Sequence, residues 1–224
     1  MAQYDRKPDG ERKGGLSEGA CSHAAMEDNM DLMPPMQALS VEPITDFRCL
    51  ATFCSGIEVM DEFIHSDFRL SVDNHFCSAY GVWADKELVA IYALSFDSLD
   101  LDSEDKSELM SGYSSAGKPD VPWTYQDTFL AKPRYPALDI AYLAVQKHYR
   151  NMHLGQAIVE LIAEKARSQD FAGCQFLTVE ALATAEYSAV GFYDKCGFTA
   201  SEVKKPYKDT IRMYRTLFKK DTGE

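Results

Sequence analysis

The chain has 224 residues, a formal net charge of −12 and 46% hydrophobic residues. This apolar content is sufficient for one full-sized core, so a wholly disordered chain is excluded. The acidic balance argues against a surface that is basic throughout, as general binding to nucleic acid or anionic lipid requires, and no apolar run approaches the roughly 20 residues that cross a bilayer.

The N-terminal segment, residues 1–38, is rich in Gly, Ser, acidic residues and Met and shows no apolar periodicity. This composition is typical of a flexible or disordered leader. The segment also lacks the apolar stretch of a signal peptide. We therefore expect a cytoplasmic protein, without a membrane partner, whose folded domain spans residues 39–220.

The six cysteines and five histidines are scattered along the chain. The sequence contains no Cys-x-x-Cys pair, and neither His65 with His75 nor His148 with His153 has the i, i+4 spacing that places two imidazoles on one helix face. We expect free thiols in a reducing compartment and no metal site.

The first half of the domain begins with a short strand at 39–44. Apolar residues from Phe53 to Phe68 then recur at three-to-four spacing, which predicts one helix with a buried face. Residues 77–84 and 88–96 are rich in Val, Tyr, Trp and Ile and are joined by a short polar turn. They predict a β-hairpin.

An acidic segment follows the hairpin. Residues 97–127 carry eight acidic and two basic side chains. The calcium-loop spacing with its obligatory glycine is absent, which argues against a metal loop. We interpret the segment as part of a solvated acidic insertion at about 97–135.

The next elements predict a strand–helix–strand unit. An unbroken apolar run at 137–145 is typical of a central strand buried on both faces. Residues 155–166 show an amphipathic helical pattern, and residues 176–181 are predicted to form a second strand. A right-handed crossover would place the two strands side by side or close together.

The remaining signals predict a helix and two strands. The helix is expected at 185–196, and Gly197 is suited to a left-handed C-cap. The strands, at 198–201 and 211–218, complete the order of elements.

The turn that precedes the helix at 155–166 is the strongest functional signal in the chain. A helix N-terminus presents unpaired N–H groups and a partial positive charge, which favour phosphate. Arg150 opens the turn and Gly155 begins the helix. The Walker and dinucleotide glycine patterns are absent, so the residues alone leave open an anion site or an ordinary helix start.

Two motifs follow the two strands of this unit. They read Arg150-x-x-His153-x-Gly155-x-Ala157 and Ala189-x-x-Phe192-Tyr193-x-x-x-Gly197-Phe198. In this order and on these elements, they resemble the pyrophosphate loop and the second signature of the GNAT superfamily of N-acetyltransferases. The element order from 39 to 218 is similar to that of the superfamily as well.

The resemblance implies an α/β fold of the GNAT type: a mixed, mostly antiparallel sheet of six to seven strands flanked by about four helices, with splayed central strands. It implies acetyl-CoA as the co-substrate, bound along the first splayed strand and the pyrophosphate loop. The matching positions are Leu143, Ala144, Val145, Arg150, Asn151, Met152, His153, Leu154, Gly155, Gln156, Ala157, Ala189, Phe192 and Tyr193.

His153 departs from the family pattern because it stands where the first loop glycine is usual. We expect its backbone to have an ordinary negative φ and its ring to point to solvent. The alternative is a ring that hydrogen-bonds a CoA phosphate.

The resemblance also assigns catalytic roles. Tyr193 stands at the family position for the acid that protonates the CoA thiolate; the alternative is an aromatic ring packed in a helix face. We nominate Glu180 as the base, with Asp139 behind it, against the alternative that both are solvated. Cys174 and Cys196 leave a covalent route open, but neither has a nearby histidine in the sequence.

A stretch near the predicted first helix suggests a subfamily. Residues 53–64 resemble a segment of acetyltransferase toxins that acetylate aminoacyl-tRNA, although Cys54, Ser55 and Ile57 depart from it. The positions in register are Phe53, Gly56, Asp61 and Phe63.

The acceptor is therefore expected to be an amine. Residues 41–202 carry about twice as many acidic as basic side chains, which disfavours tRNA without excluding it. The short C-terminal segment 203–224 is basic.

We accordingly expect an N-acetyltransferase that acts on a small-molecule or peptide amine in a direct ternary complex. One alternative is the toxin of a toxin–antitoxin pair that acetylates aminoacyl-tRNA. The other is a non-catalytic CoA-binding or protein-interaction module of the same fold. A homodimer is left open.

Overall fold

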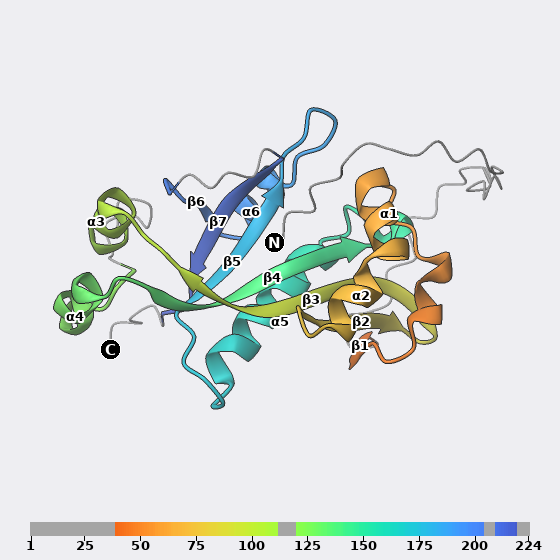
Figure 1. Ribbon diagram of the computed structural model, residues 1–224, viewed down its shortest axis with the longest axis horizontal. Helices are drawn as coiled ribbons and strands as arrows, with labels where there is room; N and C mark the ends of the chain where they lie inside the picture. The colour runs from red at the N-terminus through yellow and green to blue at the C-terminus, as the bar shows by residue number, and fades with distance from the viewer. Residues whose placement is uncertain (1–38, 112–119, 204–208, 219–224) are drawn as a thin grey trace. The chain divides into compact units, whose positions relative to one another are not determined.

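A seven-stranded sheet in the order β1-β2-β3-β4-β5-β7-β6 forms the centre of the computed structural model (Figure 1). The structure describes residues 39–111, 120–203 and 209–218. All neighbouring strands are antiparallel except β4 and β5. The strands are β1 (Leu39–Pro43), β2 (Ser78–Ala84), β3 (Glu87–Leu99), β4 (Tyr135–Val145), β5 (Phe176–Leu182), β6 (Thr199–Ala200) and β7 (Thr210–Thr216).

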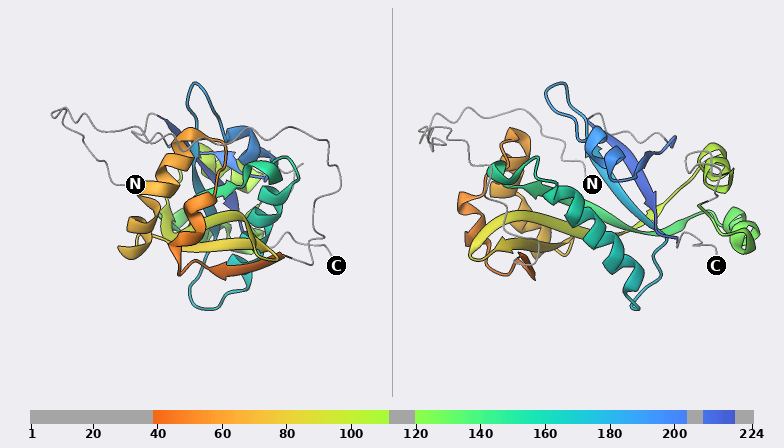
Figure 2. Two further views of the ribbon diagram at one scale, coloured as in Figure 1. Left: turned by 90° about the vertical axis from the view of Figure 1, so that its right-hand side faces the viewer. Right: turned by 180° about the vertical axis from the view of Figure 1, so that it is seen from behind.

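Helices cover both faces of this sheet (Figure 2). The α-helices are α1 (Glu58–Ser66), α2 (Phe68–Asp73), α3 (Ser103–Ser111), α4 (Gln126–Ala131), α5 (Leu154–Ser168) and α6 (Val190–Lys195). Short 3-10 helices are η2 (Phe47–Thr52), η4 (Trp123–Tyr125) and η5 (Lys147–Tyr149). The predicted mixed, mostly antiparallel α/β fold is confirmed, with more helices in the described residues than the four expected.

Two apolar layers lie on opposite faces of the sheet. On one face, Ile158 and Ile162 of α5 pack with Leu177 of β5 and with α6. On the other face, Ile64 of α1 and Phe68 of α2 pack against β2 and β3. Each such large side chain contributes roughly 1.5–3 kcal/mol when it is fully buried, so the helices hold the sheet between them.

The prediction of a single helix from Phe53 to Phe68 is wrong. Phe53 lies in a loop, Gly56 has a φ of 76°, and α1 and α2 are separate. The apolar spacing predicted the buried positions Phe53, Ile64 and Phe68. It did not reveal the break, because the side chain of Asp61 satisfies the backbone of the loop in place of helical hydrogen bonds.

The helix predicted at 185–196 is shorter, and α6 begins only at Val190. Thr184 accepts a hydrogen bond from the backbone N–H of Tyr187 at 3.1 Å, and Ser188 accepts one from Val190 at 3.3 Å. These local bonds compete with helix formation. Gly197, at a φ of 78°, follows the helix as predicted.

The acidic segment 97–135 is not simply solvated. Helices α3 and α4 lie at the end of the β3–β4 ribbon far from α1 (Figure 1), and Leu109 and Phe129 are buried there in a third core. Asp105 of α3 is also buried and accepts a hydrogen bond from the Tyr214 hydroxyl at 3.1 Å. The acidic composition of the segment gave no indication that Leu109 and Phe129 are buried.

The predicted leader, residues 1–38, lies outside the described residues. Its boundary with the domain at 39–220 stays a prediction. The basic C-terminal segment is described only in part, at residues 203 and 209–218.

Candidate active site

The parallel strands β4 and β5 pair over a short length. Their register runs from Ala137 opposite Phe176 to Asp139 opposite Thr178, and the two described strands share no further pairs. The antiparallel pairing of β3 with β4 extends along both strands instead. Beyond Asp139, the edge of β4 that faces β5 is therefore unpaired in the sheet, and this is the splay expected for the two central strands.

A β-bulge in β4 lies next to this separation. Ile140 and Tyr142 pair with consecutive residues of β3, which leaves Ala141 as an extra residue. A bulge bends its strand and increases the local twist. The prediction that this strand is buried on both faces is only partly right. Ile140 and Ala144 are buried, but Ala141, Leu143 and Val145 are partly exposed, and all five residues border a pocket.

The pocket between β4 and β5 has a volume of about 420 Å³, within the range of small-molecule sites. The N-terminus of α5, helix α6 and the loop before α1 complete its walls. The predicted cofactor-binding residues that line it are Leu143, Ala144, Val145, Arg150, Asn151, His153, Leu154, Gly155, Gln156, Ala189, Phe192 and Tyr193. Met152 and Ala157 are not among its lining residues.

The loop before α5 and the first turn of that helix line the pocket. Asn151 and His153 adopt left-handed φ values of 63° and 59°, and α5 begins at Leu154 without a side-chain cap. The Ala157 N–H bonds to the His153 carbonyl at 3.0 Å, while the preceding N–H groups have no partner within the helix. This arrangement suits an anion, since the helix dipole is positive here.

Gly155 allows α5 to approach α6 closely. A Cβ atom at this position would lie 3.1 Å from two ring atoms of Phe192 and 3.7 Å from Cγ2 of Val145. Any side chain would therefore press on the Phe192 ring. The glycine keeps the helix N-terminus, β4 and α6 together around the pocket.

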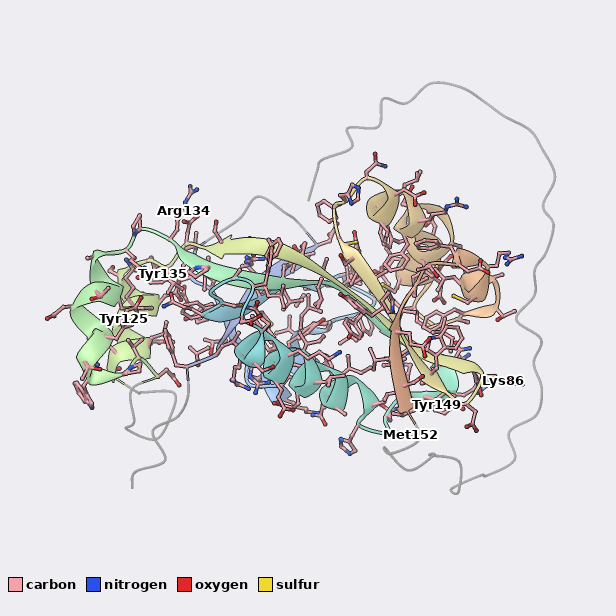
Figure 3. All side chains as sticks on the ribbon, turned by 90° about the horizontal axis from the view of Figure 1, so that it is seen from below. Lys86, Tyr125, Arg134, Tyr135, Tyr149 and Met152 are labelled. Atoms are coloured by element: carbon pink, nitrogen blue, oxygen red, sulfur yellow. The ribbon has the colours of Figure 1, made fainter. Side chains whose placement is uncertain are left out.

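Hydrogen bonds to two other segments hold this loop in position. The Arg150 guanidinium donates to the Ser55 carbonyl at 3.3 Å, and the Tyr149 hydroxyl donates to the Glu87 carboxylate at 2.9 Å. Figure 3 shows Tyr149 near the β2–β3 turn that carries Lys86. The loop is thus held both to the segment before α1 and to the sheet.

The segment before α1 is organised by Asp61. Its carboxylate accepts hydrogen bonds from the Ser55 N–H at 2.7 Å, the Ser55 hydroxyl at 2.6 Å, the Gly56 N–H at 3.1 Å and the Cys54 thiol at 3.4 Å. Burial opposes ionisation, but these bonds, with Ser55 foremost, lower the pKa of Asp61. Asp61 therefore anchors a loop whose Ser55 and Ile57 line the pocket.

Tyr193 is a buried aromatic residue of α6 that also lines the pocket. Its ring packs edge-on against Phe192 and Phe198 at centroid distances of 4.9 and 5.3 Å. Its hydroxyl makes no hydrogen bond among the described residues. Burial, reinforced by the charge of Asp139, raises the pKa of Tyr193 well above its ordinary value, so this hydroxyl stays protonated and able to donate.

A cluster of charged side chains lies where β4 and β5 begin to separate. Arg212 of β7 donates from Nη1 to Asp139 Oδ1 at 3.4 Å and to Glu180 Oε1 at 3.3 Å, and its Nη2 pairs with Asp97. The Thr178 hydroxyl lies 2.7 Å from Asp97 Oδ2 and 3.2 Å from Asp139 Oδ1. Four strands therefore meet in one network.

The carboxylates of this network differ in acidity. Burial raises the pKa of Asp139 to about 6; Arg212 opposes the increase, and the negative charges of Asp97 and Glu180 add to it. For Asp97, hydrogen bonds from Arg212 and Thr178 outweigh burial and lower the pKa. Of the two aspartates, Asp139 is thus the one whose pKa lies nearer neutral pH.

A family model agrees with this architecture. The Acetyltransferase (GNAT) family matches residues 45–198, well over half of the chain. The chain belongs to the GNAT acetyltransferase family. The expectation of an acetyltransferase is confirmed at the level of the family.

Solved structures give the same fold. A crystal structure of AtaTR bound with acetyl-CoA has a TM-score of 0.56 and 18% identity, over 81% of this chain and 95% of that one. AtaT complexed with acetyl-methionyl-tRNAfMet has a TM-score of 0.54 and 17% identity, over 78% and 93%. A KacT mutant has a TM-score of 0.54 and 18% identity, over 81% and 96%. No curated protein sequence matches the chain.

Within this GNAT fold, the predicted catalytic residues occupy different positions. Tyr193 and Glu180 both line the pocket, whereas Asp139 does not and lies behind it in the charged cluster. The structure thus brings Tyr193 and Glu180 to one cavity from α6 and β5. Their roles, and those of the predicted acetyl-CoA contacts, stay predictions.

The prediction of a negative backbone φ for His153 is wrong. Its φ is 59°, not an ordinary negative value, so the residue adopts the conformation that the usual glycine would favour. The side chain is exposed, and ring Nδ1 lies 2.6 Å from Gln156 Oε1. The histidine therefore preserves the shape of the GNAT loop at a backbone cost of roughly 1–2 kcal/mol.

Sequence reasoning missed Asp97, Thr178 and Arg212. Asp97 was counted with the acidic insertion, and Arg212 with the basic tail. The available signal was an arginine between Ile211 and Met213 in a predicted strand, where a buried charge requires a partner. Which carboxylates it meets depends on the sheet order.

The described residues contain neither a metal-binding cluster nor a membrane-spanning helix. Among residues 39–111, 120–203 and 209–218, no group of three or more His, Cys, Asp or Glu side chains could hold a metal ion. No described helix is both long and apolar enough to span a membrane.

Proposed function

We propose that the chain transfers an acetyl group from acetyl-CoA to a primary amine in a direct ternary complex. The observation that carries the proposal is a single pocket lined by Tyr193, by Glu180 and by the N-terminus of α5. A protonated phenol, a carboxylate and an anion-binding helix end are the groups that this reaction needs.

Three features support the fit of acetyl-CoA. The left-handed loop and uncapped start of α5 suit a pyrophosphate, and Arg150 stands beside them. The unpaired edge of β4 offers backbone groups to a pantetheine arm. Gly155 leaves no side chain between the two regions. When bound, acetyl-CoA supplies the activated thioester carbonyl.

The side chains then manage the protons. Glu180 accepts a proton from the ammonium, whose pKa near 10.4 would otherwise keep it charged, and the neutral nitrogen forms a bond to the carbonyl carbon. As the carbon–sulfur bond breaks, Tyr193 donates its proton to the sulfur and regains one from the nitrogen. The products are an amide, the CoA thiol and one proton that leaves through Glu180.

A cysteine route finds less support. Burial raises the pKa of Cys196 to about 11 and also raises the pKa of Cys174. Neither residue lines the pocket. Because the thiolate is the nucleophile, these buried thiols are poorly suited to form an acyl-enzyme.

For the acceptor, we propose a small-molecule or peptide amine. Glu180 is the carboxylate in the pocket lining, and the apolar side chains of Ile57 and Met60 border the same space. A cationic amine on a partly apolar body matches these groups. The acidic balance of residues 41–202 is unfavourable for a polyanion.

The second candidate acceptor is aminoacyl-tRNA. It is favoured by the shared fold of AtaT, which is solved in complex with acetyl-methionyl-tRNAfMet. The match of Phe53, Gly56, Asp61 and Phe63 to the toxin segment points the same way. A toxin would also require an antitoxin as partner.

An amine panel tests the proposal. CoA release would be measured with acetyl-CoA and a series of polyamines, aminoglycosides, amino acids, peptides and charged tRNAs. Turnover with a small or peptide amine supports the proposal, whereas turnover confined to aminoacyl-tRNA, with growth arrest on expression, supports the toxin.

Thermal unfolding with acetyl-CoA separates binding from catalysis. Stabilisation by millimolar acetyl-CoA without turnover on any amine would favour the non-catalytic CoA-binding module. No stabilisation at that concentration would contradict both the enzyme and the CoA-binding module.

A further inference from the structure

The charged cluster beside the pocket contains more groups than a single base needs. Arg212 Nη1 lies within 3.4 Å of both Asp139 and Glu180, and Nη2 of the same guanidinium pairs with Asp97. The Thr210 hydroxyl donates to the other oxygen of Glu180 at 3.2 Å. The base nominated above is therefore held on both oxygens.

Solvent has little access to the cluster. The Arg212 side chain is 6% exposed, and those of Asp139 and Glu180 are 16% exposed. Three carboxylates face one guanidinium, so full ionisation would leave excess negative charge in a partly dehydrated site.

The Thr178 hydroxyl connects two of the acids. It lies between Asp97 Oδ2 and Asp139 Oδ1, at 2.7 and 3.2 Å, but has one proton to donate. When it donates to Asp97, the closer acid, its oxygen can accept a hydrogen bond from a protonated Asp139. The geometry thus provides a position for a proton on Asp139, behind the carboxylate that lines the pocket.

We propose that Arg212 and Asp97 are positioning residues for proton acceptance: Arg212 holds Glu180 at the pocket and couples it to Asp139, and Asp97 fixes the guanidinium between them. Glu180 accepts the proton of the acceptor amine with Asp139 beside it, and the guanidinium, which can donate hydrogen bonds but cannot accept a proton, holds the two carboxylates together. This proposal rests on the acetyltransferase function proposed above.

The surroundings of Asp139 determine the direction of each expected change. The charged groups that face it are Asp97 from β3, Glu180 from β5 and Arg212 from β7. The nearby tyrosines, Tyr193 of α6 and Tyr142 of β4, have raised pKa values and are neutral. Removal of the Asp97 charge therefore lowers the pKa of Asp139.

Asp97→Asn is the principal test. The acid limb of the kcat/KM pH profile, measured with an amine that the wild-type chain acetylates, is expected to move to lower pH by about one unit. Acetyl-CoA affinity is expected to stay unchanged, because Asp97 does not line the pocket. A merely structural role would lower stability without moving the limb.

Asp100→Asn is the matched control. Asp100 lies just beyond the same strand and forms an ion pair with Arg134 at 3.1 Å, but its side chain is 52% exposed. The substitution removes the same charge from the chain and is expected to leave the pH profile in place. An equal shift in both variants would overturn the proposal, since it would reflect net charge alone.

Arg212→Lys tests the guanidinium itself. A lysine keeps the charge but lacks the planar fork that contacts three carboxylates, so kcat is expected to fall at least tenfold while KM for acetyl-CoA is retained. Should this variant fail to fold, the two aspartate variants still decide.

A second readout does not need an amine. In protein with ¹³C-labelled aspartate carboxyl groups, the resonance that titrates near pH 6 should move to lower pH in Asp97→Asn and not in Asp100→Asn. Activity with an unmoved pH limb, or an unmoved titration, would overturn the present proposal alone. No product with any amine from a folded wild-type chain would overturn the proposed function and this proposal with it.

Discussion

The two sides of the pocket are built from different parts of the chain. On the α5 side, backbone N–H groups, left-handed residues and Gly155 form the surface. On the β5 and α6 side, the functional atoms belong to side chains, Glu180 and Tyr193, and are supported by further buried side chains behind them.

This difference explains what each side tolerates. A backbone-built surface depends on φ and ψ, so His153 can replace a glycine if it adopts the same conformation. A side-chain-built surface depends on the identity of each group, and loss of one charge or hydroxyl changes the chemistry. The expected effects of substitution therefore differ in kind as well as in size.

The largest effect is expected for Tyr193→Phe. Loss of a general acid typically lowers kcat by about 100- to 10,000-fold, whereas acetyl-CoA affinity and stability should change little, because the hydroxyl makes no hydrogen bond among the described residues. Steady-state kinetics and thermal unfolding measure both. Tyr92→Phe, at a buried tyrosine that does not line the pocket, is the control; undiminished turnover in Tyr193→Phe would refute the acid.

Asp61→Ala tests the loop that joins the two sides. It leaves the N–H groups of Ser55 and Gly56 without their acceptor, which costs about 2–3 kcal/mol of unfolding free energy. Because the folded pKa of Asp61 is lowered, its contribution is complete above the unfolded pKa of about 4 and is lost as pH falls through the folded value. Urea unfolding at pH 7 and at pH 3 should show the difference shrinking.

The control for Asp61 is Asp73→Ala. Asp73 forms an exposed ion pair with Arg69 at 3.3 Å, and such pairs contribute about 0–1 kcal/mol. Equal losses in the two variants would show that the Asp61 network is no stronger than a surface contact.

Gly155→Ala tests close packing on the backbone-built side. The new Cβ would lie 3.1 Å from the Phe192 ring, so the ring must move, at a cost of about 1–2 kcal/mol. Acetyl-CoA affinity should fall together with stability. Gly173→Ala is the control, because a Cβ there meets nothing within 4 Å; it should retain stability and acetyl-CoA affinity. If Gly155→Ala also left both unchanged, α5 would be able to shift away from the Phe192 ring at no cost.

The smallest effect is expected for His153→Gly. Relief of the left-handed backbone should raise the unfolding free energy by less than about 1 kcal/mol, because glycine also gains freedom in the unfolded chain. His153→Ala removes the ring but keeps the strain, so it should bring no such gain. Acetyl-CoA titration of both variants tests the role of the ring. A loss of acetyl-CoA affinity above about tenfold in both variants would indicate that the ring hydrogen-bonds a CoA phosphate.

The strand–helix–strand unit was readable from the sequence because its signals are local. The apolar run before Gln146 and the amphipathic pattern of α5 each lie within one segment, and Gly197 marks the end of α6. The break between Phe53 and α1 could not be predicted, because it depends on hydrogen bonds that Ser55 donates to the Asp61 carboxylate. Periodicity carries no information about such bonds.

The residues of the candidate site could likewise be predicted only where their signals are local. Tyr193 and Gly155 belong to motifs that resemble a family, and Glu180 ends a predicted strand. Arg212 and Asp97 are separated by 115 positions and meet because the sheet order places β3, β4, β5 and β7 next to one another. Without the order of the strands in the sheet, the sequence gives no indication that these two residues form an ion pair.

The short pairing of β4 with β5 has a consequence for the order of folding. Strands β1 to β4 are consecutive neighbours in the sheet, and β5, β6 and β7 form a second group. Three register pairs join β4 to β5 within the sheet. Since local contacts form at a lower loop-closure cost, we expect each group to assemble early and the contact between them late, so the cavity that carries the chemistry would be the last part of the domain to take shape.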